Sequence, residues 1–175
     1  MPSLRERLRI FQGDITSLEV DAVVTAANAA LMGGSGVDGA VHDAAGPELV
    51  QASMQLAPCP AGQARLTASF GLSGRFVIHA VGPIFSSLKV DGPILSSAYR
   101  SSLGLASLHH VESIAFPCIS TGVYRFPPDS ACEIACDAVI QWLEQQETPH
   151  TVTFCCFEDR DVQLYRDRLR SFGVE

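Results

Sequence analysis

Residues 28–46 bring together a flexible backbone and the polar side chains that chemistry on a nucleotide would use. Four glycines occur close together in this stretch: Gly33, Gly34, Gly36 and Gly39. Glycine permits sharp turns and close approach to a ligand, and the helix pattern that follows offers free N–H groups and a positive dipole end to a phosphate. Asn28, Asp38 and His42 add a carboxamide, a carboxylate and an imidazole. Phosphate binding beside titratable groups indicates chemistry on a nucleotide rather than storage alone.

Residues 34–39 fit the pattern Gly-x-Gly-x-x-Gly, but their context does not suit a dinucleotide dehydrogenase. The preceding strand ends near Ala26, well before these glycines, and the next strong strand ends at 79–82 without an acid. A Rossmann loop starts directly after its strand and needs that acid for the ribose. Gly39 is not followed by Lys and Ser or Thr, which excludes a Walker loop, and Val37 excludes a Gly-x-Ser-x-Gly elbow.

Two further loops carry polar groups at the expected ends of strands. Asp14 follows a strand and can accept a hydrogen bond from the exocyclic amine of adenine, and an aspartate there also caps a helix well; we expect both roles. In the segment 117–127, backbone N–H groups with the hydroxyls of Ser120 and Thr121 can cradle phosphate oxygens, while Tyr124 and Phe126 can wall a sugar. The alternative for this segment is an ordinary turn whose aromatic side chains pack inward.

The elements that must position these loops alternate between strands and helices. Strands are predicted at 6–11, 21–26, 62–70, 76–81, 113–117 and 151–157, and helices at 37–53, 92–109, 128–146 and 159–172. This alternation predicts an α/β layered domain with a largely parallel sheet. Ligands of such sheets bind at the carboxyl ends of the strands, where the three loops would meet. We find no repeat or linker and expect residues 1–175 to form a single domain.

Composition limits the functional classes further. The chain has 175 residues, of which 47% are hydrophobic and 18% charged, and its net charge is −7. This balance indicates a globular protein and disfavours a surface built to bind the nucleic-acid backbone. No apolar run reaches the length of a membrane span and the first residues show no signal-peptide core, so we expect a cytoplasmic protein. We also expect a monomer.

The cysteines and His79 are expected to be structural. None of the six cysteines forms a Cys-x-x-Cys pair, and histidines at ligand spacing are missing. We therefore expect buried, reduced thiols and neither a metal nor a cofactor. His79 falls in the middle of a buried strand, where a packing role is expected.

Taken together, these motifs resemble the macrodomain family, most closely its MacroD-type ADP-ribosylhydrolase branch. The matching segments cover nearly the whole chain, in order: residues 13–16, 26–28, 34–42, 44–47, 77–83 and 116–124. The resemblance implies a three-layer α/β/α fold with a mixed, mostly parallel six-stranded sheet and a cleft for ADP-ribose.

The resemblance also implies a role for each matching residue. On the adenine side, Asp14 would bind the amine, Ile15 would line the pocket and Phe157 would pack on the ring. The diphosphate and the distal ribose would be wrapped by two segments: Gly36 and Val37, and Ser120, Thr121, Gly122, Val123, Tyr124 and Arg125. The catalytic set would be Asn28 on the ribose hydroxyls, Asp38 on the attacking water, and His42, which can also simply orient its neighbours.

The implied activity is a metal-independent hydrolysis of ADP-ribose esters. The substrates would be mono-ADP-ribose on protein Asp or Glu, and O-acetyl-ADP-ribose. Ester hydrolysis needs an oriented water, which a carboxylate in a dry cleft rich in amide groups can supply. Two alternatives stay open: a non-catalytic module that reads ADP-ribose, and, more weakly, a hydrolase acting on ADP-ribosylated nucleic acid, which the negative net charge disfavours.

Four positions depart from the pattern of the family. Thr25 and Ser35 stand where Asn and Gly are usual, and Asp43 and Arg125 where Arg and Gly are usual. Thr25 keeps a hydroxyl but lacks an amide, so a supporting hydrogen bond is at risk. Arg125 places a long cation beside the distal ribose. Because the last two changes have opposite sign, we hypothesise that Arg125 and Asp43 pair across the mouth of the cleft.

Overall fold

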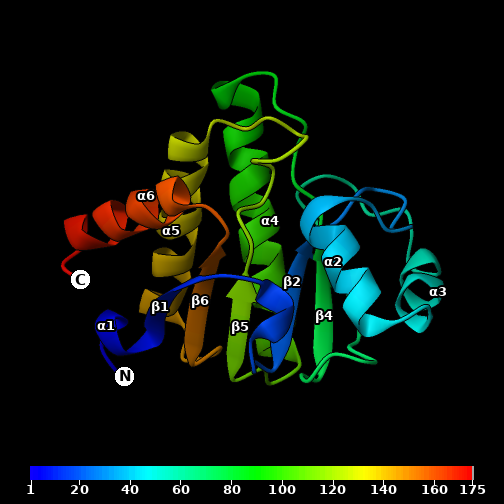
Figure 1. The fold of residues 1–175 in the computed structure, drawn as a ribbon. Coiled ribbons are helices and arrows are strands. Elements are labelled where there is room, and N and C mark those ends of the chain that lie inside the picture. The colour runs from blue at the N-terminus through cyan, green and yellow to red at the C-terminus, as the bar shows by residue number, and fades with distance from the viewer. Residues whose placement is uncertain (175) are drawn as a thin grey trace.

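A six-stranded sheet forms the centre of the computed structural model, which describes residues 1–174 (Figure 1). Its strands are β1 (Leu8–Gln12), β2 (Ala22–Ala26), β3 (Ala64–Ala68), β4 (Phe76–Ala80), β5 (Ser113–Phe116) and β6 (Thr151–Cys156). They lie in the order β1-β6-β5-β2-β4-β3, and every neighbouring pair is parallel except β3 with β4. The expected mixed, mostly parallel sheet is confirmed.

Helices cover both faces of the sheet. They are α1 (Leu4–Arg7), α2 (Gly36–Ala45), α3 (Glu48–Met54), α4 (Leu88–Leu108), α5 (Pro128–Gln145) and α6 (Asp159–Ser171), with a 3₁₀ turn, η1 (Ile15–Ser17). Neighbouring residues of β4 show the two layers, because Ile78 packs in the core with α4 and α5 while Val77 packs in the core with α2. The three-layer α/β/α arrangement is thereby confirmed (Figure 1).

The structure corrects three predicted boundaries. The helix expected over 37–53 is two helices, because Gly46 adopts a φ of 92° and Pro47 lacks an N–H, so α2 ends and α3 begins on a new axis. The first strand starts only at Leu8, after the short α1. The helix expected from 92 starts at Leu88, where the Ser87 side chain accepts from a backbone N–H of the first turn.

The amino-terminal segment is fixed by a buried arginine. The Arg7 side chain is 1% exposed and donates to four backbone carbonyls, those of Leu143, Gln146, Pro149 and His150, at 2.7–3.0 Å. Burial of the guanidinium lowers its pKa. Arg7 therefore ties the start of β1 to the connection between α5 and β6. No helix within residues 1–174 combines the length and the apolar character needed to span a bilayer.

Candidate functional site

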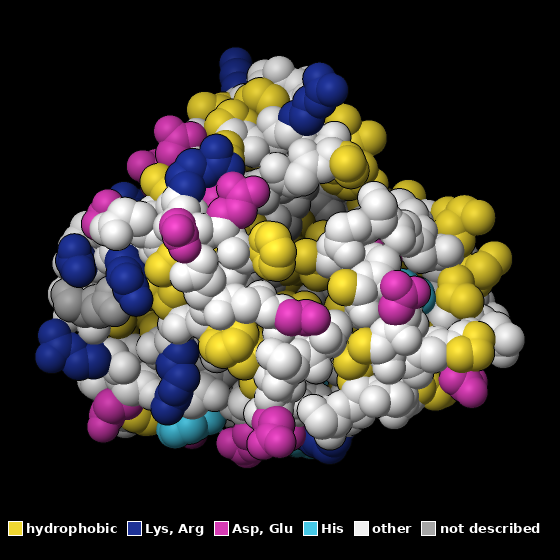
Figure 2. Space-filling model, viewed as in Figure 1, with side chains coloured by type: hydrophobic (Ala, Val, Ile, Leu, Met, Phe, Trp, Pro, Cys, Tyr) yellow, Lys and Arg dark blue, Asp and Glu magenta, His cyan; other side chains and the backbone are white. Residues whose placement is uncertain are grey.

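Four adjacent parallel strands end at the same edge of the sheet and carry the predicted site residues into loops there. The order β1-β6-β5-β2 places residues 13–16, 157–158, 117–127 and 27–35 side by side along this edge. Figure 2 views the molecule from the side of α2, with this edge toward the top, and shows a hollow between the 117–127 loop and α2. The three loops recognised in the sequence are therefore brought together.

Asp38 lies in the first turn of α2 and is 4% exposed. Its Oδ1 accepts a hydrogen bond from Thr25 Oγ1 at 2.8 Å, and His42 Nε2 lies 3.5 Å from the same oxygen. Burial raises the pKa of Asp38, although the Thr25 bond and the charge of His42 act in the opposite direction. The carboxylate is therefore desolvated and oriented. Its pKa lies above that of an exposed aspartate, which suits a proton acceptor.

Thr25 contributes more to this site than the sequence indicated. It is the last residue but one of β2, its side chain is fully buried, and its hydroxyl supplies the hydrogen bond to Asp38. The substitution of Thr for the usual Asn therefore leaves the carboxylate with a donor at this position. The sequence placed Thr25 near the end of a strand and Asp38 at the start of the next helix, and this order was the one indication that the two side chains could meet.

The glycine loop is held against Asp38 by Asn28. Asn28 Nδ2 donates to the Gly33 carbonyl at 2.8 Å, and its Oδ1 accepts from the Met32 N–H at 3.4 Å. A methyl group built on Gly34 would lie 3.4 Å from Asp38 Oδ2 and 3.7 Å from Asn28 Nδ2. Asn28 and Asp38 therefore lie on either side of Gly34, with the glycine loop packed beside both.

His42 connects this site to a second histidine. Its Nδ1 is buried without a hydrogen-bond partner in the described part of the chain, and its ring centroid lies 6.0 Å from that of His79. His79 Nε2 pairs with Thr67 Oγ1 at 2.9 Å. Burial, and then the charge of His42, lower the pKa of His79 to about 4. His79 is therefore neutral near pH 7, which agrees with the packing role expected for it.

The residues expected around adenine lie at the ends of β1 and β6. Asp14 Oδ1 accepts from the N–H and the hydroxyl of Thr16 at 2.9 and 2.7 Å, bonds that lower the pKa of Asp14. The capping role of Asp14 is therefore confirmed, and its Oδ2 has no donor among residues 1–174. Ile15 is buried, whereas Phe157 is 79% exposed and offers a free aromatic face.

The loop after β5 uses its hydroxyls internally. Ser120 Oγ donates to the Pro83 carbonyl and Thr121 Oγ1 to the Cys118 carbonyl, both at 2.9 Å. Phe126 is buried and packs edge-on against Phe85, so this aromatic packs inward as the alternative proposed. Within the described chain no acceptor meets the N–H groups of residues 122–124. An anion cradle in this loop would therefore use backbone N–H groups, with Tyr124 half-buried beside them.

A second set of free N–H groups comes from α2. Gly36, Val37 and Asp38 form its first turn, where no preceding carbonyl of the helix can accept. Gly36 adopts a φ of 61°, and a methyl built on it would meet nothing within 4 Å. The start of α2 and the 117–127 loop thus present N–H groups at the same edge of the sheet.

The expected ion pair between Arg125 and Asp43 is wrong. Arg125 is exposed and has a φ of 61°, and its backbone N–H donates to the Gly122 carbonyl in a tight turn. Within residues 1–174 neither side chain takes part in an ion pair. Asp43 instead lines a cavity beside α2 with His42 and Gly46. Opposite charges at two motif positions did not reveal the direction of either side chain.

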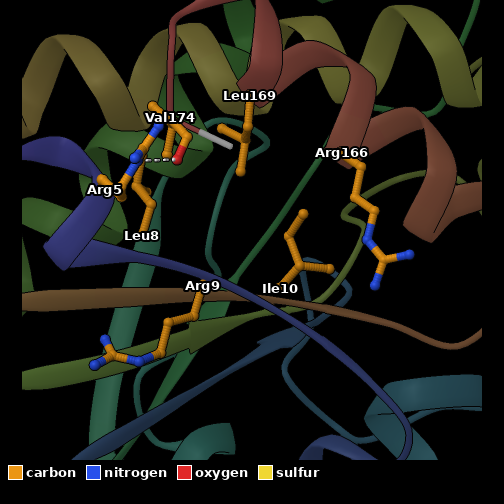
Figure 3. Close-up of a pocket in the computed structure, with 7 residues that line it drawn as sticks. All are labelled: Arg5, Leu8, Arg9, Ile10, Arg166, Leu169 and Val174. Carbon is orange, nitrogen blue, oxygen red and sulfur yellow. Dashed lines mark hydrogen bonds between the residues drawn. The ribbon is translucent and has the colours of Figure 1, made fainter.

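A cavity of about 560 Å³ lies away from this edge, between β1 and α6 (Figure 3). Three arginines line it, but Arg9 and Arg166 extend in different directions, and Arg5 donates to the Val174 carbonyl at 3.2 Å. The guanidinium groups therefore do not converge on one point. All six cysteines are free thiols, and the described residues hold no cluster of three or more potential metal ligands from His, Cys, Asp and Glu.

We expect the Asp38→Asn variant to be more stable than the wild type at neutral pH. Burial raises the pKa of Asp38, so its ionisation disfavours the folded state as pH rises through that pKa, and this cost is absent at low pH. The amide keeps an oxygen that can accept from Thr25. Urea unfolding at about pH 7 and about pH 3 measures the difference. A variant that is less stable at neutral pH would contradict a desolvated carboxylate.

Comparison with known proteins identifies the family that this chain resembles. The sequence profile of the family described as "Macro domain" matches residues 24–135. A macro domain-containing protein of Ralstonia nicotianae is 49% identical over 170 residues, which are 97% of this chain and 98% of the relative. The ADP-ribose glycohydrolase MACROD1 of Bos taurus is 44% identical over 169 residues, and the chain spans 52% of that relative's length.

The solved structures that resemble this chain are also macrodomains. The macrodomain of Oceanobacillus iheyensis with ADP superposes with a TM-score of 0.93 and is 37% identical, covering 98% of this chain and 95% of that one. The Trypanosoma brucei macrodomain in complex with ADP-ribose gives a TM-score of 0.88 at 36% identity, with 95% and 72% covered.

Proposed function

The chain belongs to the macrodomain family, and on this premise we propose that it is a hydrolase that binds ADP-ribose and cleaves ADP-ribose esters. Its substrates in this proposal are proteins that carry mono-ADP-ribose on Asp or Glu, and O-acetyl-ADP-ribose. The supporting observation is the buried Asp38 carboxylate, oriented by Thr25 beside Asn28 and the free N–H groups that start α2. In the same proposal residues 1–175 form one macrodomain that acts as a cytoplasmic monomer without a metal.

The proposed binding mode uses groups at the carboxyl edge of the sheet. Adenine lies between Ile15 and Phe157 with its amine on Asp14. The diphosphate takes the N–H groups of two segments, residues 36–38 and 122–124. The distal ribose lies at the inner end of the cleft, where Asn28 binds its hydroxyls.

The proposed reaction begins with a water held by Asp38. The carboxylate accepts a proton as the water oxygen attacks the carbonyl carbon of the ester, and the bond to the ribose oxygen breaks. The products are a free carboxylic acid and a ribose hydroxyl, which takes up the proton. His42 lies 3.5 Å from Asp38 and stabilises the ionised carboxylate before the attack. Positioning by the ribose contacts supplies the proximity effect.

A non-catalytic ADP-ribose reader is the second candidate. The observation that favours it is Arg125, an exposed cation in the 117–127 loop where an anion could be held without turnover. Incubation with a protein mono-ADP-ribosylated on glutamate separates the two functions. Release of free ADP-ribose supports the hydrolase, whereas retention of the label together with measurable binding assigns the reader. A nucleic-acid substrate is disfavoured by the net charge of −7.

We expect Asp14→Ala to weaken the binding of ADP-ribose by about 1–3 kcal/mol, the usual cost of losing a hydrogen bond to a charged group. The Asp14→Asn variant is the matched control, because an amide oxygen still accepts from Thr16 and preserves the cap. Calorimetric titration of both variants measures the effect. If Asp14→Ala keeps the full affinity, Asp14 is a cap and nothing more.

A further inference from the structure

A groove of about 460 Å³ runs along the outer side of α2. One wall is the loop 32–34, and the floor is one face of α2, formed by Gly39, His42 and Asp43, together with Gly46 directly after the helix. The start of α3 closes one end. We call this cavity the α2 groove. It is distinct from the cleft that receives the nucleotide, although the two share a wall.

That shared wall is one loop thick. Gly34 lines the α2 groove, and a methyl built on it would lie 3.4 Å from Asp38 Oδ2. A methyl built on Gly33 would lie 3.8 Å from the ring of His42, which also lines the groove. A group bound in the α2 groove is therefore separated from Asp38 only by the backbone of the glycine loop.

Two carboxylates without ion-pair partners in the described chain lie at the α2 groove, where His42 is the ionisable basic side chain among the lining residues. Asp43 is exposed and lines it, and a methyl built on the lining residue Gly46 would lie 3.1 Å from Glu48 Oε2. Neither carboxylate takes part in an ion pair within residues 1–174, and no lysine or arginine lines the groove. Two unpaired carboxylates beside a cavity complement a cation.

We propose that the α2 groove binds a lysine or arginine side chain of the protein that carries the ADP-ribose ester, close in sequence to the modified Asp or Glu. This rests on the proposed function, in which the acyl part of the ester joins the nucleotide to a polypeptide at Asp38, and loop 33–34 is the wall that lies beside Asp38. A basic side chain on the far side of that wall meets Asp43 and Glu48.

Two peptides that carry ADP-ribose on the same glutamate test this proposal, one flanked by lysines and one by serines. For the wild-type protein we expect kcat/KM to be about 3- to 10-fold higher with the basic peptide at low salt, the range for two exposed ion pairs. The preference should shrink as salt rises. In Asp43→Lys it should vanish or reverse. The matched control is Glu144→Lys, the same charge change at an exposed position of α5 on the opposite face of the sheet, which should keep the preference.

The possible outcomes distinguish a failure of the docking proposal from a failure of the proposed function. Equal kcat/KM for the two peptides, or a preference that persists in Asp43→Lys, overturns the α2 groove as a docking site. If the protein binds but does not hydrolyse, the dissociation constants of the same two peptides give the same decision. Titration of each variant with free ADP-ribose shows whether its cleft is intact. If the wild-type protein does not bind ADP-ribose, the proposed function itself is contradicted.

Discussion

Asp38→Ala is expected to lower the turnover of ADP-ribose esters by about 100-fold or more while leaving the dissociation constant of ADP-ribose within a few-fold. General acid–base groups contribute about 10²–10⁴-fold to rates, and Asp38 is the buried carboxylate that the other site residues surround. Binding should survive because the adenine side, the diphosphate N–H groups and Asn28 are not changed. Steady-state release of ADP-ribose and calorimetric titration measure the two effects.

Thr25→Val provides the internal control for this expectation. Valine keeps the shape of threonine but removes the donor to Asp38 Oδ1, so the carboxylate remains and loses its orientation. We expect an intermediate loss of turnover. If Asp38→Ala turns over as fast as the wild type, the attacking water is oriented by another group, such as a phosphate of the substrate.

Gly39→Ala is expected to weaken ADP-ribose binding by about 10-fold or more and to lower the free energy of unfolding by about 1–3 kcal/mol, the usual cost of overpacking. A methyl at this position would lie 2.7 Å from the carbonyl oxygen of Gly34. The atom that the methyl meets belongs to the backbone of the loop and cannot rotate aside, so the loop must move away from α2. That movement pulls on the bond from Asn28 to Gly33 and opens the wall beside Asp38.

Gly104→Ala is the matched control for a glycine within a helix. Its methyl would meet Trp142 Cη2 at 3.9 Å, an ordinary contact, so the variant should gain about 0.5–1 kcal/mol from the better helix propensity of alanine. Chemical denaturation and ADP-ribose titration of both variants check the contrast. If Gly39→Ala gains stability like Gly104→Ala and keeps full affinity, the glycine loop is not held by close packing on α2.

Strand and helix periodicity predicted most of the fold because the buried elements read clearly in the sequence. The apolar run at 76–81 is a central strand with both faces covered, and such strands lack alternation. The division of α2 from α3 was missed because the apolar pattern continues across Gly46 and Pro47. Backbone conformation at one glycine, rather than hydrophobic periodicity, decides that break.

The sequence was enough to predict which loops meet at the candidate site, but not all of the contacts within it. Asn28, Asp38 and the loops at 13–16 and 117–127 meet at one edge because parallel strands must deliver them there. The bond from Thr25 to Asp38 depends on which face of β2 the helix covers. The failure of the pair between Arg125 and Asp43 has the same origin, since side-chain direction depends on tertiary packing.

Calorimetric titration of the wild-type protein with ADP-ribose tests the central claim most directly. We predict a single site with a dissociation constant on the order of micromolar, and weaker binding by Asp14→Ala than by Asp14→Asn. No detectable binding at millimolar ADP-ribose would show that the cleft at the carboxyl edge of the sheet does not receive this nucleotide, and would contradict the proposed function.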